Sequence, residues 1–82
     1  MTKENFKQQL DSIYMKDGVI KINNTTIKSG YDEYFREWYF YVNDGIEEIP
    51  YCYIDSYGTI LYEAVIILIY DEYFNKKNLR LN

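Results

Sequence analysis

The sequence predicts one small α+β domain over residues 1–82: an N-terminal helix, an antiparallel sheet of three to four strands, and a C-terminal helix packed on that sheet. Three observations support this prediction. The length of 82 residues suits a single domain. The hydrophobic share, 48% with Tyr included, is sufficient for a folded core. Segments with the periodicity of a helix and of a strand follow one another in the predicted order.

The first segment has the apolar spacing of an amphipathic helix. One helical face receives the residues at i, i+4, i+7 and i+8, which are Phe6, Leu10, Ile13 and Tyr14. Thr2 is placed to cap the start of this helix. Asp17-Gly18 is expected to end it, because glycine readily adopts the left-handed conformation that closes many helices.

A β-hairpin is expected next, around Asn23-Asn24, since two asparagines suit a two-residue turn. This turn pairs Ile22 with Thr25 and Ile20 with Ile27 on one face of the hairpin. The other face receives Val19, Lys21, Thr26 and Lys28. Such an arrangement is typical of a sheet that is covered on one side only.

Two further strands are expected, over residues 36–42 and 46–54, joined by a turn at residues 43–45. In the first strand, Trp38, Phe40 and Val42 alternate with more polar residues, so these three are expected in the core.

In the second strand, the alternation predicts that Cys52 and Ile54 face the core. Tyr51 and Tyr53 then fall on the opposite face, near the tyrosines of the preceding strand. Pro50 lacks a backbone N–H and indicates either a strand at the edge of the sheet or an irregular approach to it.

The last segment, residues 59–77, fits either a buried strand or a helix, because it contains an unbroken apolar run over residues 64–70. Its length, a capping position for Thr59, and a favourable pair between Glu72 and Lys76 favour the helix. Lys76 and Lys77 would also lie at the negative end of the helix dipole.

The absent residue types exclude much of enzyme chemistry. The chain has no histidine, so a histidine general base, a Ser/His/Asp or Cys/His nucleophile and a histidine metal site are excluded. The single cysteine, Cys52, is too little for zinc and cannot form an internal disulfide, which favours a reducing compartment. The N-terminal segment is too polar for a secretory signal. We therefore expect a cytoplasmic protein that is not an enzyme and that needs no metal or cofactor.

The charges are unevenly distributed along the chain. The formal net charge is −4, but residues 29–75 contain ten of the 13 acidic residues and only one of the nine basic residues, Arg36. Ten of the 11 tyrosines lie in the same segment. Clustered carboxylates repel one another and lower the stability of a compact domain, whereas a basic partner gains from them. A second interpretation stays open, in which structure and solubility alone account for this pattern. Tyrosines favour strands and the rims of sheets, and acids favour solvated surfaces.

Over residues 31–73 the chain resembles the small acidic anti-CRISPR and other anti-defence proteins of phages and mobile elements in low-GC bacteria. The resemblance lies in size, charge and the clustering of Tyr, Asp and Glu. It implies a phage protein that inhibits a nucleic-acid-binding protein of the bacterial host cell by blocking its binding surface, as a DNA mimic does. It assigns no functional residue.

We therefore expect a basic protein partner, such as a nuclease or a nucleic-acid-guided effector, and no direct binding of nucleic acid or membrane. The expected contact residues are Asp32, Glu33, Tyr34, Glu37, Glu47, Glu48, Asp71 and Glu72. Two alternatives remain: a toxin-neutralising or immunity protein that uses the same charges, and a small structural homo-oligomer, possible as a homodimer.

Overall fold

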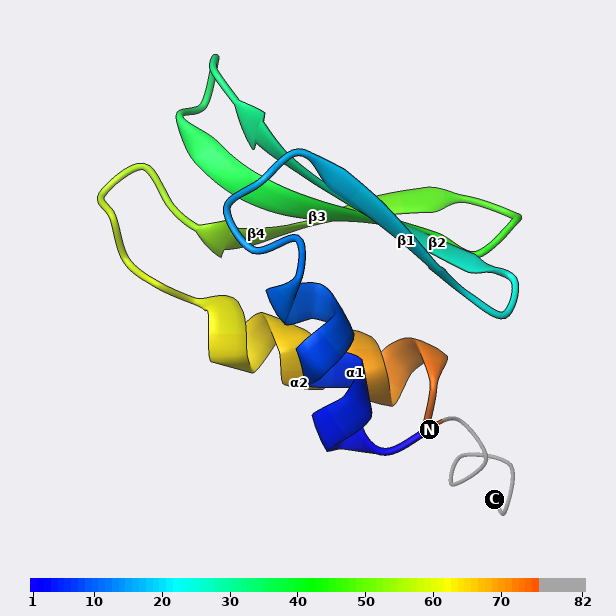
Figure 1. Ribbon diagram of the computed structural model, residues 1–82. Helices are drawn as coiled ribbons and strands as arrows, with labels where there is room; N and C mark the ends of the chain where they lie inside the picture. Colours follow the sequence, from blue (N-terminus) through cyan, green and yellow to red (C-terminus); the bar gives the residue numbers. More distant parts are fainter. Residues whose placement is uncertain (76–82) are drawn as a thin grey trace.

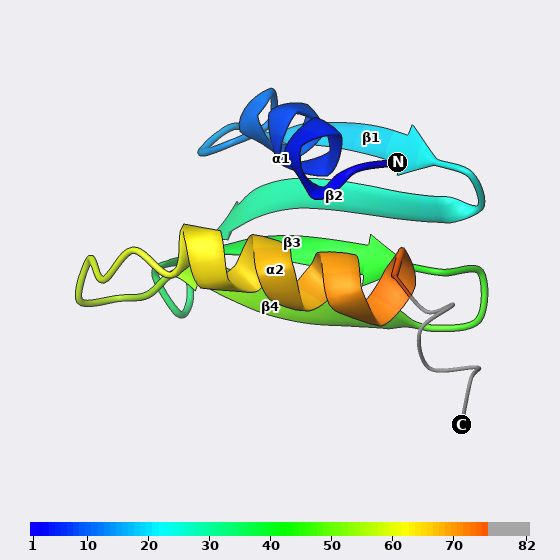
Figure 2. The same ribbon diagram turned by 90° about the horizontal axis from the view of Figure 1, so that it is seen from below.

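The computed structural model describes residues 1–75 and confirms the predicted fold class. The elements are α1 (Lys3–Asp11), β1 (Gly18–Ile22), β2 (Thr25–Asp32), β3 (Glu37–Asn43), β4 (Glu48–Ile54) and α2 (Tyr62–Tyr73). The strands form one antiparallel sheet in the order β1-β2-β3-β4. Both helices lie on the same side of it, so the molecule has two layers and one open sheet face (Figures 1 and 2). Neither of these helices is long and apolar enough to cross a bilayer.

Helix α1 begins as predicted but ends earlier. The Thr2 hydroxyl accepts the N–H of Asn5 at 3.1 Å and caps the helix. The predicted end at Asp17-Gly18 is wrong: α1 stops at Asp11, and Met15 takes a left-handed conformation with φ 54°. Gly18 serves a different purpose, because a Cβ there would lie 2.6 Å from the Cγ2 of Ile13.

The predicted hairpin is confirmed. Ile22 pairs with Thr25 and Ile20 with Ile27, and Asn23 takes the left-handed conformation that this turn needs (φ 55°). The faces are also as expected, since Ile22 and Ile27 are buried, whereas Val19, Lys21 and Lys28 are exposed. Strand β2 continues beyond the hairpin and pairs with β3 as far as Asp32 opposite Glu37.

The core confirms Phe40 and Val42, but it corrects the orientation predicted for β4. Tyr53 is completely buried, whereas Cys52 is half-buried and pairs with Tyr39. Tyr51 pairs with the buried Phe40 and packs against the core, as Ile54 and the half-buried Trp38 also do.

A tyrosine occupies this core because its hydroxyl finds partners there. The Tyr53 ring stacks on Phe40, with centroids 4.1 Å apart. Its hydroxyl lies 2.7 Å from the Ser29 hydroxyl and accepts the N–H of Met15 at 2.9 Å. A bulge between Trp38 and Tyr39 shifts the pairing of β3 with β4 at the same place.

The C-terminal part is helical, with different boundaries from those predicted. Strand β4 is at the sheet edge, as Pro50 indicated. Helix α2 begins at Tyr62 and not at Thr59. The backbone N–H and carbonyl of Thr59 both form hydrogen bonds with Asp55 in the preceding turn. Lys76 and Lys77, with the expected Glu72–Lys76 pair, lie outside the described residues.

Candidate interaction surface

The structure divides the predicted contact residues into two groups of four at opposite ends of the sheet. Four belong to the β2–β3 connection: Asp32, Glu33, Tyr34 and Glu37. The other four lie at the end where β3 turns into β4 and where α2 stops: Glu47, Glu48, Asp71 and Glu72 (Figures 1 and 2). The seven residues of β3 separate the two turns by about 20 Å. The predicted single surface is therefore two surfaces.

We call the first surface the aromatic end: the β2–β3 connection (residues 32–37) and the loop of residues 55–61, which Figures 1 and 2 place at the same end of the sheet. Its first turn is built around Asp32, whose Oδ1 accepts the N–H groups of Tyr34 and Phe35 at 2.9 Å. This turn holds both rings outward, 86% and 56% exposed, with their centroids 4.9 Å apart in an edge-to-face contact. The Asp32 carboxylate thus has a structural role as well as a charge.

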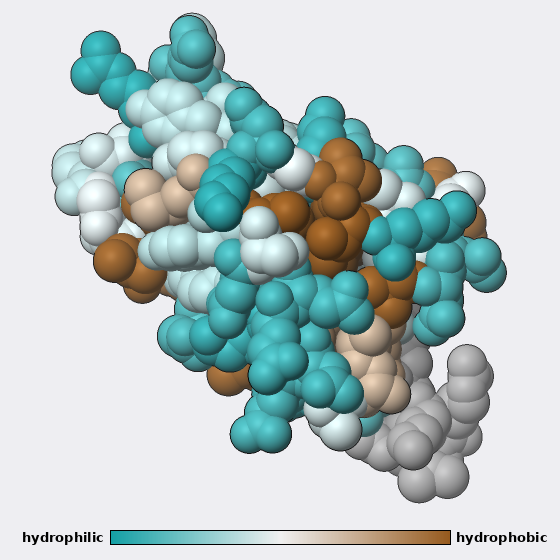
Figure 3. Space-filling model, viewed as in Figure 1, coloured by the Kyte–Doolittle hydropathy of each residue, from teal (hydrophilic) through white to brown (hydrophobic). Residues whose placement is uncertain are grey.

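The second loop of the aromatic end repeats this construction. The Oδ1 of Asp55 accepts the N–H groups of Tyr57 and Thr59 at 2.9 Å. Tyr57 is 93% exposed and Ile60 is 66% exposed. Figure 3 shows a brown, apolar patch at its left edge, over this loop. Phe35, Tyr57 and Ile60 were not among the predicted contact residues. For Tyr57 a signal was present, because Asp55 followed by Gly58 is a typical turn pattern, and the residue between them is expected to be exposed.

Glu37 extends the aromatic end onto the open sheet face. The Tyr39 hydroxyl donates a 2.6 Å hydrogen bond to Glu37, and this bond raises the pKa of the phenol. Burial, reinforced by the Glu37 carboxylate, raises the pKa of the neighbouring Cys52 thiol to about 11. At neutral pH the thiol is therefore protonated and a weak nucleophile.

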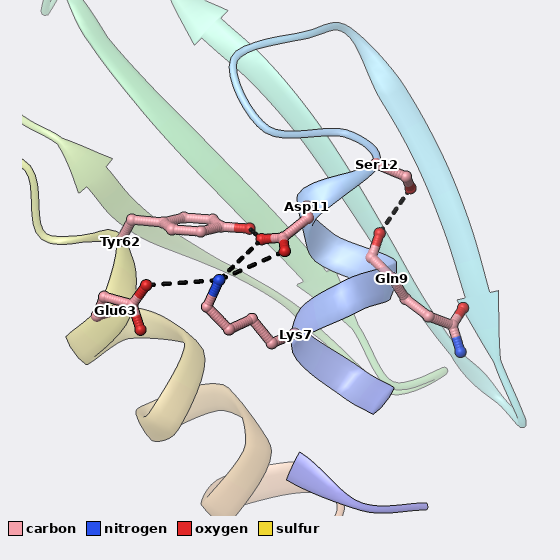
Figure 4. A network of polar contacts seen from close by, with 6 residues as sticks. All are labelled: Lys7, Gln9, Asp11, Ser12, Tyr62 and Glu63. Carbon is pink, nitrogen blue, oxygen red and sulfur yellow. Dashed lines mark hydrogen bonds and ion pairs between the residues drawn. The ribbon is translucent and has the colours of Figure 1, made fainter. Parts of the chain in front are cut away.

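Ion pairs neutralise acids between the two helices, away from the predicted contact residues. Lys7 of α1 lies 3.3 Å from Asp11 and 3.5 Å from Glu63 of α2, and the Tyr62 hydroxyl also donates to Asp11 (Figure 4). Within residues 1–75, none of the seven predicted carboxylates forms an ion pair. These seven charges are directed to solvent or to backbone and phenol donors.

The second surface, which we call the far end, comprises the turn of residues 44–47, Glu48 and the last turn of α2. Here the Tyr51 and Tyr73 hydroxyls lie 3.2 Å apart and join the sheet to α2. The turn carries one large exposed apolar side chain, Ile46, at 90%. The far end thus has five acids against the four of the aromatic end, but it lacks the exposed rings.

The open sheet face between the two ends is mixed in charge. A shallow hollow of about 510 Å³ lies over Gly30, with Lys28, Asp17 and Tyr41 in its wall. The Lys28 Nζ lies 5.5 Å from the centroid of the Tyr41 ring. In the described part of the chain, no group of three or more Cys, Asp or Glu side chains is arranged to hold a metal ion. The hollow, with one cation and one carboxylate, indicates no particular ligand.

The aromatic end is the surface best suited to a protein partner. It combines exposed rings with carboxylates that no cation of residues 1–75 neutralises. Aromatic residues are the commonest anchors of protein interfaces, and unpaired carboxylates attract basic surfaces. Neither a family model, nor a curated protein, nor a solved structure matches the chain.

Proposed function

We propose that the chain is a non-enzymatic binding protein whose aromatic end covers a basic surface of another protein. The observation that supports this most directly is the exposure of Tyr34 and Tyr57, at 86% and 93%, beside the carboxylates of Asp32 and Asp55. Burying such rings on a partner removes their apolar surface from water, which is favourable. A tyrosine also loses little side-chain entropy when it is immobilised.

The partner chemistry follows from the charges. Asp32, Glu33, Glu37 and Asp55 lie within one end of the sheet, where Arg36 is the cation of the β2–β3 turn. A protein surface that binds nucleic acid is rich in Lys and Arg, because it neutralises phosphates and often stacks bases on flat side chains. Carboxylates can take the place of the phosphates, and the rings of Tyr34 and Tyr57 the place of the bases. The chain would then inhibit a nuclease or a nucleic-acid-guided effector by occupying its binding groove.

The test is affinity capture from a bacterial lysate treated with nuclease, so that nucleic acid cannot bridge the proteins. The wild type is compared with a variant that combines Tyr34→Ala and Tyr57→Ala, and with Ile46→Ala as a matched control at the far end. We expect a protein that the wild type and the control retain and that the double variant loses.

The retained protein then identifies the mode of action. We expect its binding of labelled nucleic acid, followed by fluorescence polarisation, to be displaced by the wild type and not by the double variant. A retained protein toxin without nucleic-acid binding would support the toxin-neutralising alternative. Retention that is equal for the wild type and the double variant would exclude the aromatic end as the contact.

A further inference from the structure

A row of apolar side chains crosses the sheet beside the aromatic end. Tyr31 of β2 pairs with Trp38 of β3, Trp38 pairs with Ile54 of β4, and Ile54 forms an isolated bridge with Ile60 of the following loop. Residues directly opposite each other in neighbouring strands lie on the same face of a sheet. This face is the helix side, because Trp38 and Ile54 pack against the core. We call these four residues the cross-strand row.

The rest of the chain leaves the cross-strand row partly open. Tyr31 is 45% exposed at one end and Ile60 is 66% exposed at the other, whereas Trp38 and Ile54 between them are half-buried. Adjacent strands lie about 4.8 Å apart, so the row is about 14 Å long. Its ring half consists of Tyr31 and Trp38, whose centroids lie 5.4 Å apart with the planes tilted by 59°. An exposed tyrosine beside a half-buried tryptophan is a typical anchor point for a partner side chain.

Each strand that contributes to the row carries an acid next to its row residue. The acids are Asp32, Glu37 and Asp55. Asp32 and Glu37 are themselves opposite each other in the sheet. The Oδ1 atoms of Asp32 and Asp55 are held by N–H groups of their turns, and within residues 1–75 their Oδ2 atoms accept no hydrogen bond. Negative oxygen atoms at the ends of these strands therefore remain available to a cation.

The described chain places no cation of its own on the ring half. Two lysines of residues 1–75 lie over rings, Lys7 over Tyr62 and Lys28 over Tyr41, each with its Nζ 5.5 Å from the ring centroid. Neither ring belongs to the row. The basic residue of the adjoining turn, Arg36, forms no ion pair and lies over no ring within the same residues. The row thus combines flat aromatic surface and nearby carboxylates with an unfilled place for a cation.

We propose that the ring half of the cross-strand row binds an arginine of the basic partner, with the guanidinium flat against Tyr31 and beside Trp38. A guanidinium is planar and weakly hydrated, so it stacks on rings and bonds to a carboxylate at the same time, whereas the ammonium of a lysine is compact and strongly hydrated. Asp32 at the end of the same strand supplies the negative charge. Ile54 and Ile60 would take an apolar side chain about three residues from the arginine, since an extended chain spans about 3.3 Å per residue.

The assignment rests on the proposed function, because it names the side chain with which a nucleic-acid-binding groove would meet this end of the sheet. Arginines in such grooves contact phosphates and stack on bases. Here Asp32 would take the place of the phosphate and Tyr31 that of the base. The two proposals fail separately, because capture of the partner is tested through Tyr34 and Tyr57, and neither belongs to the row.

The test uses the free full chain and two short peptides, acetyl-Arg-Gly-Gly-Leu-amide and the matched acetyl-Lys-Gly-Gly-Leu-amide. Trp38 is the single tryptophan, so its indole N–H gives one identifiable signal in the NMR spectrum of the nitrogen-labelled protein. We expect both peptides to shift this signal, the arginine peptide with a Kd at least about threefold lower. The methylene protons of the peptide arginine should also shift upfield, because they would lie over a ring.

Three variants separate stacking from charge. Tyr31→Leu removes the ring and keeps an apolar residue, so it should abolish the preference for arginine. Tyr41→Leu is the matched control, because it removes a half-buried tyrosine on the open sheet face and should leave both Kd values unchanged. Asp32→Asn keeps the acceptor of the turn and removes the charge, so both peptides should bind more weakly while the preference remains. Circular dichroism checks that each variant is folded.

Equal Kd values for the two peptides, or an unshifted indole signal, would overturn the arginine assignment. A preference for arginine that Tyr31→Leu leaves intact would also overturn it. If Tyr31→Leu does not fold, the wild type decides, since arginine methylene protons that do not shift upfield exclude stacking. Arginine binding as expected, together with capture that the variant of Tyr34 and Tyr57 does not lose, would support the row and overturn the turn rings as the contact.

Discussion

The two ends of the sheet have the same sign of charge but different surroundings. Each has a tight turn built on an aspartate: the Oδ1 of Asp32 accepts two backbone N–H groups at one end, and the Oδ1 of Asp44 does so at the other. At the aromatic end these turns project rings into solvent. At the far end the tyrosines face inward, and Tyr51 and Tyr73 bond to each other.

This difference shows that acidity alone does not mark a contact surface. The far end uses its tyrosines to hold the sheet on α2, so its acids remain without aromatic neighbours that could anchor a partner. The aromatic end uses its acids to shape two loops, and the same loops expose Tyr34, Phe35 and Tyr57. We therefore expect binding to depend on the aromatic end, although the far end carries more acids.

The largest expected effect is on affinity, from Tyr34→Ala combined with Tyr57→Ala. Truncating two exposed anchors should weaken binding of the captured partner by at least about 2 kcal/mol, or about 30-fold. Ile46→Ala at the far end should change the Kd less than about twofold. Isothermal titration calorimetry measures both. Equal losses at the two ends would remove the distinction between them.

The next effect concerns stability, through Asp32. Asp32→Ala removes the acceptor of two N–H groups and should lower the free energy of unfolding by about 1 kcal/mol. Asp32→Asn keeps the acceptor oxygen and removes the charge, so its stability should be close to that of the wild type. Urea unfolding measures this difference. If Asn is as destabilising as Ala, the carboxylate charge and not the turn geometry is what stabilises this connection.

Charge reversal is expected to change the rate of association at the aromatic end more than at the far end. Glu33→Lys and Glu47→Lys make the same change in two exposed turn residues. At low ionic strength, Glu33→Lys should slow association with a basic partner about fivefold, and Glu47→Lys less than about twofold. Stopped-flow or surface plasmon resonance measurements at several salt concentrations provide these rates. A larger effect of Glu47→Lys would move the contact to the far end.

The smallest effect is on the reactivity of Cys52. Because burial and the Glu37 carboxylate raise the thiol pKa to about 11, alkylation should still accelerate between pH 9 and that value. Glu37→Gln should lower this pKa, whereas Glu48→Gln at the far end should not change it. The folded state holds this proton more tightly than the unfolded state, so the free energy of unfolding should fall as the pH rises from about 9 to about 11. An alkylation profile that Glu37→Gln leaves unchanged would contradict the influence of this carboxylate.

Local patterns were sufficient for much of the fold. The asparagine pair was sufficient to predict the hairpin register, and Pro50 was sufficient to indicate a strand at the sheet edge. Both residues act through the backbone within a few positions. The orientation of β4 at residues 51–53 depends on distant residues and was predicted wrongly, whereas Ile54 packs against the core as predicted. Tyr53 is buried because Ser29 and Met15 supply its hydroxyl with partners, and these lie 24 and 38 residues away along the chain.

The division of the candidate site could have been predicted. A strand was expected over residues 36–42, and a strand separates the residues before it from those after it, here Glu33 from Glu47. What the sequence could not show is which tyrosines of the strands are buried. Tyr53 lies between Cys52 and Ile54 in an alternating pattern that placed it on the outer face of its strand, yet its side chain is fully buried.

The bond from the Met15 N–H to the buried Tyr53 hydroxyl has a consequence for hydrogen exchange. The Met15 side chain is 49% exposed and lies in the loop between α1 and β1, where amide protons usually exchange within seconds to minutes. This amide exchanges when its bond to the Tyr53 hydroxyl breaks, either by a local movement of the loop or by opening of the core. Deuterium uptake at this loop position, compared with uptake at the amides of β3, therefore shows whether the loop opens alone or together with the core.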